Sequence, residues 1–297
     1  AWLPGSGLSV PTPTSLLIVL MYVILFLLFP PRRSRWTWVG AALGIVVLAA
    51  AITYPSIKTS QVCEITILDS TVGLDGVVVA PGGERLVFSG ARPLWPGQKG
   101  GGPGPLPAYL HWRLYRTLDA VVALPLNSRN APELLALAQE FRVGGFWWRQ
   151  ERQPEGPMVE LINLLGDQGK PARSLDRGNP PQALGEVFLA YPSWEGGQAG
   201  ALEVTYQGRR VLLLPPLRRA ALLKLPWPAR DRPLAALVAP GDVPAELLKR
   251  LNPERLVLFG EPAEGKEFPS CPVFFSRWGA VSLHLAPGSV TVQEWSP

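Results

Sequence analysis

Histidine and cysteine are both scarce in this chain, whose 297 residues include only two of each. A hydrolase that holds two zinc ions takes most of its ligands from imidazole side chains, and this chain cannot supply them. His111 and His284 stand far apart in the sequence, and no CxxC, HExxH or phosphate-binding loop pattern is present. We therefore expect both histidines to be structural, and much familiar metal-dependent enzymology is excluded.

Charged residues are also few, at 17% of the chain against roughly 25% in a typical soluble protein. The 28 basic and 23 acidic residues give a net charge of +5. This composition excludes a disordered polyelectrolyte. Proline (33) and glycine (30) together make up about a fifth of the residues, so long unbroken helices are not expected outside a membrane.

Two long apolar segments dominate the beginning of the chain. The first 31 residues carry no charge, and within them residues 13–29 reach the length of a short membrane span. Residues 36–54 form a second charge-free segment of spanning length. We predict two transmembrane helices, at about 13–29 and 36–54, within a membrane region that covers residues 1–57. The alternative is a signal peptide followed by a buried core helix, but neither segment ends in a small-residue cleavage pattern.

The link between these segments predicts the orientation of the chain in the membrane. It contains Arg32, Arg33 and Arg35 and no acidic residue. Because basic links stay on the cytoplasmic side, residues 58–297 are expected to be extracytoplasmic, in a multi-pass protein of the plasma membrane. The remainder of the chain carries a net charge of only 5 − 3 = +2, which argues weakly for nucleic-acid binding by that part.

Residues 58–297 alternate between strand-like and helix-like segments. Short runs rich in β-branched residues and separated by Gly or Pro predict strands at 64–68, 76–80, 85–88, 118–124, 144–148, 186–191, 201–206, 209–214, 234–239, 254–259, 272–275, 280–285 and 289–295. Amphipathic stretches predict helices at 107–117, 131–140, 157–166 and 243–251. This interleaving predicts an α/β fold, a layered sandwich with helices on the outer faces of its sheets. Strand order does not follow from the pattern.

Particular residues mark the starts of two of these helices. Asn130 and Glu133 predict an N-cap followed by a capping box, and Asp242 with Pro244 repeats the signal for the helix at 243–251.

Cys63 and Cys271 stand near the two ends of the segment 58–297. In an oxidising compartment they can pair and close the domain on itself, or they can remain two separate thiols. Both alternatives stay open, because only the distance between the two residues decides between them.

The order of segments resembles the metallo-β-lactamase-fold domain at the C-terminal end of ComEC-type competence proteins. The stretches that carry the resemblance are ITILDSTVGLDG (65–76), LVFSGA (86–91), the helix, strand and loop of 109–141, YQGRRVLLLPP (206–216) and RWGAVSLHL (277–285). The resemblance implies transmembrane helices followed by an αββα sandwich. It also implies a membrane core that passes single-stranded DNA into the cytoplasm and an outer domain that, when intact, degrades the opposite strand.

The residues that hold metal in this family are replaced in the present chain. The family's HxHxDH loop supplies three imidazoles and a carboxylate to two zinc ions. Side by side with the family's motifs, the corresponding positions are Leu74, Pro125, Asn127, Arg129, Asn130, Pro216, and Gly241 or Asp242. Pro and Leu offer no ligand, Asn binds zinc poorly, and Arg129 places a permanent cation where a metal would lie. We therefore expect no metal, no cofactor and no catalysis.

Three functions remain open. The first is the C-terminal part of a ComEC-like DNA-uptake channel with an inactive outer domain that binds, guides or braces. The candidate DNA contacts are Arg129, Arg209, Arg210, Arg218 and Arg219. The partners expected with this function are DNA, the lipid bilayer, and upstream membrane segments or other proteins of the uptake machinery, with no small-molecule substrate.

The other two functions use different features. A membrane-tethered structural or partner-binding domain without a nucleic-acid role is consistent with the near-neutral charge, in which case the arginine pairs are solvated strand ends. A hydrolase with relocated ligands would use the available carboxylates, which suit Mg²⁺ or Mn²⁺ better than zinc; these are Asp69, Asp75, Asp119 and Asp242.

Overall fold

The computed structural model describes residues 61–70, 73–91, 104–127, 129–150, 156–170, 172–174, 182–190, 201–216, 222–223, 234–260, 271–276 and 279–295. The chain divides into two compact units, Ala1–Gln61 and Val62–Pro297. The predicted membrane helices at 13–29 and 36–54 lie outside the described residues. Within the described ranges, no helix has the length and apolar character needed to cross a bilayer.

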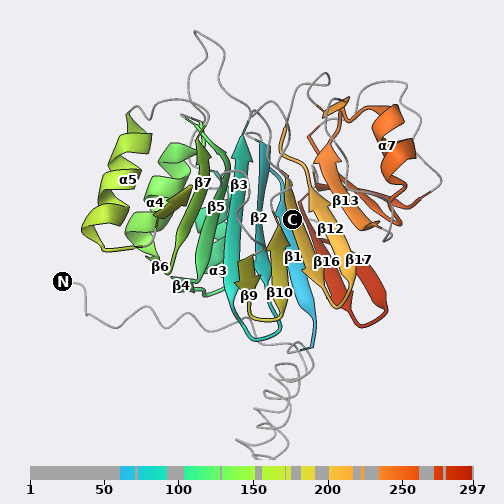
Figure 1. Cartoon of the computed structure of the whole chain (residues 1–297), viewed down its shortest axis with the longest axis horizontal. Helices are drawn as coiled ribbons and strands as arrows, with labels where there is room; N and C mark the ends of the chain where they lie inside the picture. The colour runs from blue at the N-terminus through green and yellow to red at the C-terminus, as the bar shows by residue number, and fades with distance from the viewer. Residues whose placement is uncertain are drawn as a thin grey trace, which may run out of the picture. The chain divides into compact units, whose positions relative to one another are not determined.

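The larger of two main sheets in the second unit has eight strands, in the order β17-β16-β1-β2-β3-β5-β7-β8 (Figure 1). These strands are β1 (Cys63–Leu68), β2 (Gly73–Val79), β3 (Arg85–Ala91), β5 (Ala120–Leu126), β7 (Phe146–Gln150), β8 (Ala172–Ser174), β16 (Ala280–Ala286) and β17 (Ser289–Trp295). Pairing is antiparallel from β17 to β3 and parallel from β3 to β8. The first and last parts of the unit therefore lie side by side, with Cys63 opposite Leu285.

The second sheet has seven strands, in the order β15-β14-β13-β12-β11-β10-β9. These strands are β9 (Gln182–Leu184), β10 (Val187–Ala190), β11 (Leu202–Tyr206), β12 (Arg209–Leu213), β13 (Leu234–Pro240), β14 (Leu256–Phe259) and β15 (Val273–Phe275). Pairing is antiparallel from β9 to β12 and parallel from β12 to β15. A separate two-stranded ribbon joins β4 (Thr117–Leu118) to β6 (Arg142–Val143).

Helices cover the outer faces of both sheets (Figure 1). Buried side chains of α3 (Leu106–Trp112), α4 (Ala131–Glu140) and α5 (Pro157–Asp167) pack with the outer face of the larger sheet. Those of α7 (Ala245–Leu251) pack with the outer face of the smaller one. The predicted layered α/β sandwich is therefore confirmed.

Strict alternation along the strands separates the layers. In β2, Leu74 and Val78 lie in the core between the two sheets, whereas Val77 packs under the helices. Because successive side chains of a strand point to opposite faces, Asp75 shares the helix-facing side with Val77. Neighbouring residues of β2 therefore belong to different layers: one side chain lies between the sheets and the next lies under the helices.

Several predicted boundaries are wrong, for local reasons. The helix predicted at 107–117 ends at Trp112, and Leu114 has the left-handed φ of 59° that stops a helix. The helix predicted from residue 243 begins at Ala245, and Pro244 rather than Asp242 occupies its N-cap position. The short strands β6, β8 and β9 were not predicted, because two or three residues are too few to show alternation.

Candidate functional site

The positions that correspond to the family's metal ligands gather at one end of the sandwich, which we call the site end. Gly73 at the start of β2 pairs with Ala91 at the end of β3, and β5 runs parallel to β3 toward the same edge. The segment after β5 contains Asn127, Arg129 and Asn130 and leads directly into α4. Pro216 arrives at the end of β12 from the other sheet, while Gly241 and Asp242 follow β13, which is parallel to β12.

Asn127 holds the loop before α4 together with its side-chain amide. Its Nδ2 donates to the carbonyl oxygen of Ala91 at 2.8 Å, and its Oδ1 accepts the backbone N–H of Arg129 at 2.9 Å and of Asn130 at 3.4 Å. The side chain is buried. Both ends of this amide are therefore committed to the backbone, as in the Asx turns that asparagine commonly forms.

Asn130 completes the same loop from the other side. Its Oδ1 accepts the backbone N–H of Asn127 at 2.9 Å, and its Nδ2 donates to the carbonyl oxygen of Ser89 at 3.4 Å. Asn130 is the N-cap of α4 by position, as predicted, but its side chain makes no capping hydrogen bond to the helix. The amide ties the loop to strand β3 instead, so the capping interpretation of its side chain is wrong.

Two prolines that follow strand β12 of the second sheet pack against the strands of the first at the site end. A methyl group added to Gly73 would lie 3.0 Å from Cγ of Pro216, and one added to Gly90 would lie 3.0 Å from Cβ of Pro215. Pro216 itself is buried. The absence of a side chain at these glycines thus lets neighbouring backbone carbonyl groups and the two proline rings lie close to β2 and β3.

A dinuclear zinc site does not fit this arrangement. Zinc requires nitrogen, sulfur or carboxylate ligands, but the asparagine amides here hold backbone groups and the neighbouring ring of Pro216 has no donor atom. Leu74 lies in the apolar core between the sheets. The side chain of Pro125 is outside the described part of the structure. Among the described residues, no group of three or more His, Cys, Asp or Glu side chains could hold a metal ion.

The four carboxylates of the relocated-ligand hypothesis do not come together. Asp75 lies on the helix-facing side of β2, and Asp69 is exposed after β1. Asp119 lies just before β5, at the end of the sandwich opposite the site end, where its Oδ2 accepts the backbone N–H of Arg85 at 2.8 Å. Asp242 is exposed in the turn after β13, where the N–H of Gly241 donates to the carbonyl oxygen of Phe259 at 2.9 Å.

Asp75 instead belongs to a buried acidic pair with Glu133 of α4. The hydroxyl of Ser70 donates to Oδ2 of Asp75, and Oε1 of Glu133 accepts the backbone N–H of Leu106 at 3.0 Å. Burial, and secondarily the charge of Asp75, raise the pKa of Glu133 to about 8; burial also raises the pKa of Asp75. Glu133 was predicted to close a capping box on its own helix, but it caps the start of α3.

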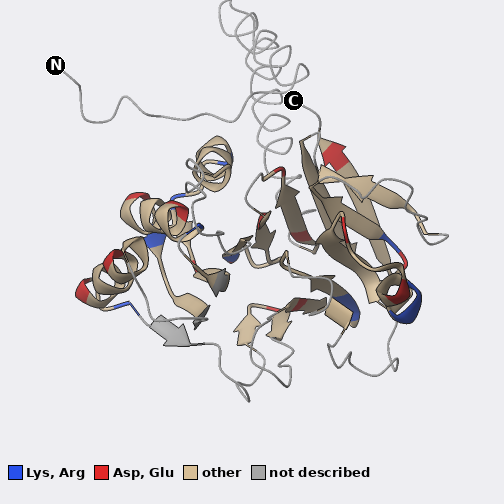
Figure 2. Ribbon diagram, turned by 90° about the horizontal axis from the view of Figure 1, so that it is seen from above, with Lys and Arg blue, Asp and Glu red and all other residues tan. Residues whose placement is uncertain are grey.

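The candidate DNA-contacting arginines are divided between the two ends of the sandwich. Arg129 is half-buried in the loop at the site end. Arg209 and Arg210 begin β12 at the opposite end, where Arg209 pairs with Glu254 at 3.0 Å and Arg210 with Glu203 at 2.8 Å. Arg218 and Arg219 lie outside the described residues. Figure 2 likewise shows basic and acidic positions interspersed over the described ribbon.

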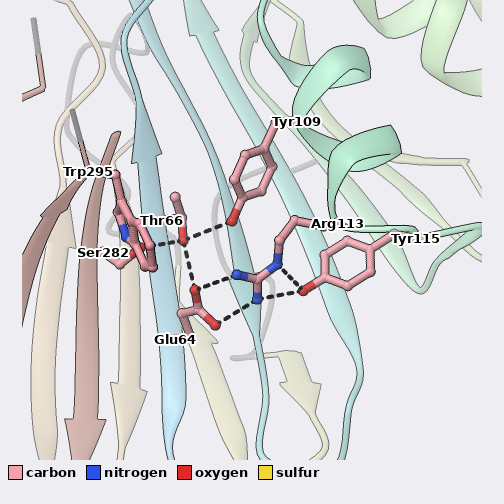
Figure 3. A network of polar contacts seen from close by, with 7 residues as sticks. All are labelled: Glu64, Thr66, Tyr109, Arg113, Tyr115, Ser282 and Trp295. Atoms are coloured by element: carbon pink, nitrogen blue, oxygen red, sulfur yellow. Dashed lines mark hydrogen bonds and ion pairs between the residues drawn. The ribbon is translucent and has the colours of Figure 1, made fainter. Parts of the chain in front are cut away.

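A polar network on the outer face of the larger sheet was not predicted (Figure 3). Arg113, just after α3, donates to both carboxylate oxygens of Glu64 at 3.2 and 2.9 Å and to the hydroxyl of Tyr115 at 3.1 and 2.9 Å. Tyr109 of α3 donates to Thr66 at 3.2 Å. No sequence motif marks these residues, because the network forms only when α3 packs on β1.

The same network extends to the last strand of the domain. The hydroxyls of Thr66 and Ser282 lie 2.9 Å apart, and Nε1 of Trp295 donates to Ser282 at 3.1 Å. The network thereby joins three parts of the chain that are distant in the sequence: β1, the α3 region and the β16–β17 hairpin.

Cys63 and Cys271 are both free thiols. Cys63 lies in the core between the sheets, whereas Cys271 packs against the apolar cluster on the outer face of the smaller sheet. A sheet therefore separates the two side chains, which favours the alternative of two separate thiols. Burial raises the pKa of Cys63 to about 12, which disfavours the reactive thiolate form.

Comparison with known proteins identifies the fold. No protein-family model matches the chain, and no curated protein matches its sequence. Among solved structures, the metallo-β-lactamase-fold protein YhfI from Bacillus subtilis is similar over 73% of this chain and 98% of its own, with 10% identity and a TM-score of 0.50. The sandwich therefore has the metallo-β-lactamase fold.

Two further structures are similar at lower scores. CmlA, a diiron β-hydroxylase from Streptomyces venezuelae, is 10% identical over 66% of this chain and 44% of its own, with a TM-score of 0.43. A diphosphatase from the PhnP family is 9% identical over 76% of this chain and 98% of its own, with a TM-score of 0.44.

Proposed function

We propose that this domain, a metallo-β-lactamase fold in which the asparagines at two of the metal-ligand positions bind the backbone, is an inactive outer domain of a ComEC-like DNA-uptake protein. Its role there is to bind, guide or brace rather than to hydrolyse. The observation that carries the proposal is the loop before α4, in which the amides of Asn127 and Asn130 bind backbone groups instead of metal. The order of segments that resembles ComEC-type proteins supplies the biological context.

The apolar beginning of the chain supports a membrane role. Residues 13–29 and 36–54 have the length of membrane spans, and a cytoplasmic basic link between them would put residues 58–297 outside the cytoplasm. In this arrangement residues 58–297 lie on the side of the membrane from which DNA would arrive.

Arg129 is the residue through which this domain would contact DNA. It lies at the site end, in the loop that replaces the metal-binding motif, and its planar guanidinium group has the geometry for paired hydrogen bonds to phosphate oxygens. Arg209 and Arg210 are weaker candidates, because Glu254 and Glu203 neutralise them at the opposite end.

The test is the binding of the full chain in detergent to single- and double-stranded oligonucleotides at two salt concentrations. We expect salt-dependent binding, and we expect Arg129→Gln to reduce the slope of log affinity against log salt by about 1, the value for one lost phosphate contact. Arg142→Gln, which removes an exposed arginine of β6, is the matched control and should leave binding unchanged. The absence of binding at low salt would overturn the DNA-guiding role.

A second candidate function is a membrane-tethered partner-binding or structural domain. The pairing of Arg209 and Arg210 with acidic residues favours it, since these cations are not available to phosphate groups. The exposed side chain of Trp112 at the end of α3 favours it too, because tryptophan is enriched at protein interfaces. An absence of DNA binding in the experiment above would leave this function as the better account.

A further inference from the structure

The two main sheets have four edge strands, and one of them differs from the rest in length. β8, β9 and β15 contain three residues each, whereas β17 contains seven. Very short edge strands are a common protection against unwanted pairing, because they offer few free backbone groups. In the described part of the chain, β17 pairs with β16 alone and lies at the end of the strand order. Among the strands that the structure describes, its other edge is therefore the longest one that pairs with no neighbour.

The composition of β17 also favours pairing. Its sequence, SVTVQEW, contains no proline, glycine or lysine, the residues that usually interrupt or guard an edge. Val290 and Val292 face the core between the sheets, while Thr291 and Gln293 are exposed. The charged residue, Glu294, accepts the backbone N–H of Phe275 at 3.4 Å and so joins β17 to β15.

We infer that β17 pairs with β17 of a second copy of this chain, antiparallel and centred on Val292, to form a continuous sheet across a two-fold dimer. A two-fold axis requires the same surface on both copies, and an antiparallel pair of identical strands meets that requirement. With the pair centred on Val292, each of the seven residues of β17 lies opposite a residue of β17 in the second copy. This register also places residues of the same face opposite each other, so that the core sides of both copies stay on one side of the sheet.

The side chains that meet in this register are compatible. Thr291 lies opposite Gln293 of the second copy, and Val292 lies opposite its own equivalent. The remaining pairs are Val290 with Glu294 and Ser289 with Trp295, so no two like charges face each other directly. The inner face of the interface thus has a central valine pair with a Val290–Glu294 pair on each side, and the outer face has Thr291–Gln293 and Ser289–Trp295 pairs.

Trp295 adds a side chain suited to an interface. It is 42% exposed, although its Nε1 is held by Ser282 at 3.1 Å and the polar network of Figure 3 fixes Ser282 in turn. A large aromatic side chain that is already oriented loses little conformational freedom on association. Tryptophan is also among the residues that contribute most to binding energy at interfaces.

The test is the mass of the full chain in mild detergent by size-exclusion chromatography with light scattering, after subtraction of the detergent. We expect twice the chain mass of 32.3 kDa for the wild type. Thr291→Lys with Gln293→Lys places lysine opposite lysine twice in the proposed register, and we expect it to give the mass of one copy. Thr291→Lys with Gln293→Glu places lysine opposite glutamate in the same register, and we expect it to restore the dimer.

A matched control adds the same charge elsewhere. Val159→Lys with Asn163→Lys changes two exposed residues of α5 and should leave the dimer intact. Circular dichroism identical to the wild type establishes that each variant is folded. A single-copy mass for the wild type would overturn the inference. So would a dimer that survives the double lysine variant, or a lysine–glutamate variant that does not re-form it.

Discussion

At the residue scale, the buried carboxyl group of Glu133 shows how strongly one side chain depends on its surroundings. On an isolated helix it would face its own N-terminus, but here it lies 3.0 Å from the backbone nitrogen of Leu106 and close enough to Asp75 for that charge to raise its pKa. The same logic governs Asn127 and Asn130, whose amides hold a loop. The sequence indicates a helix-capping role for Glu133 and former metal-ligand positions for the two asparagines, but only tertiary packing decides which atoms these side chains contact.

Glu133 predicts an unusual dependence of stability on pH. Its pKa rises from 4.5 to about 8 on folding, so the folded chain binds a proton more tightly than the unfolded chain between these values. The contribution of Glu133 to the free energy of unfolding should therefore fall as the pH rises across that window. Glu133→Gln keeps an acceptor for Leu106 without the charge, and we expect it to stabilise the protein by about 1 kcal/mol at the upper end.

Denaturant unfolding of the full chain, followed by tryptophan fluorescence at pH values across this window, measures the effect. Glu160→Gln, at an exposed position of α5, is the control and should follow the wild-type curve. An unfolding free energy that depends on pH equally in the wild type and in Glu133→Gln would contradict the assignment of this pH dependence to Glu133.

At the element scale, the domain depends on contacts that join segments distant in the sequence. α3 is only seven residues long and ends at Trp112, because Leu114 turns into the left-handed region. Arg113 then reaches the outer face of β1, where it donates to the carboxylate of Glu64 and to the hydroxyl of Tyr115 (Figure 3). Periodicity predicts that a helix lies here, but the turn that ends it and the ion pair that holds it depend on tertiary packing.

Removal of Arg113 should loosen α3. Arg113→Met leaves the half-buried carboxylate of Glu64 without its cation, and we expect a loss of about 1–3 kcal/mol in the free energy of unfolding. Arg116→Met, at a nearby exposed arginine, should cost less than about 0.5 kcal/mol. Denaturant unfolding of both variants measures the difference.

A double variant separates the pair from general effects of mutation. Combining Arg113→Met with Glu64→Gln should cost less than the sum of the two single variants, because the ion pair can be lost only once. Equal costs for Arg113→Met and Arg116→Met would show that the network does not hold α3.

At the scale of the whole molecule, much of the architecture could be predicted and the strand order could not. Alternation and glycine or proline breaks located the long strands, and the strand at 289–295 has its predicted bounds. The pairing of β1 with β16, which brings the two ends of the domain together, has no local signal. The sequence also has no local signal for the face on which each cysteine lies. A sheet separates Cys63 from Cys271 only once the layers have assembled.

The site end also belongs to this scale, because it is assembled from both sheets. The resemblance to ComEC-type proteins predicted which positions to compare, and the structure brings Asn127, Asn130 and Pro216 to one end. The resemblance does not predict that proline rings pack on Gly73 and Gly90, because that contact forms only when both sheets are at their final separation.

The most direct test of a fold kept without its metal chemistry is the metal content of the purified full chain. The chain is incubated with excess zinc or manganese, freed of unbound ions and measured by inductively coupled plasma mass spectrometry. Because the ligand positions hold proline, leucine and asparagine amides already bonded to the backbone, we expect well below one metal ion per chain. One or two tightly held ions per chain would contradict this account and would make the domain a candidate hydrolase.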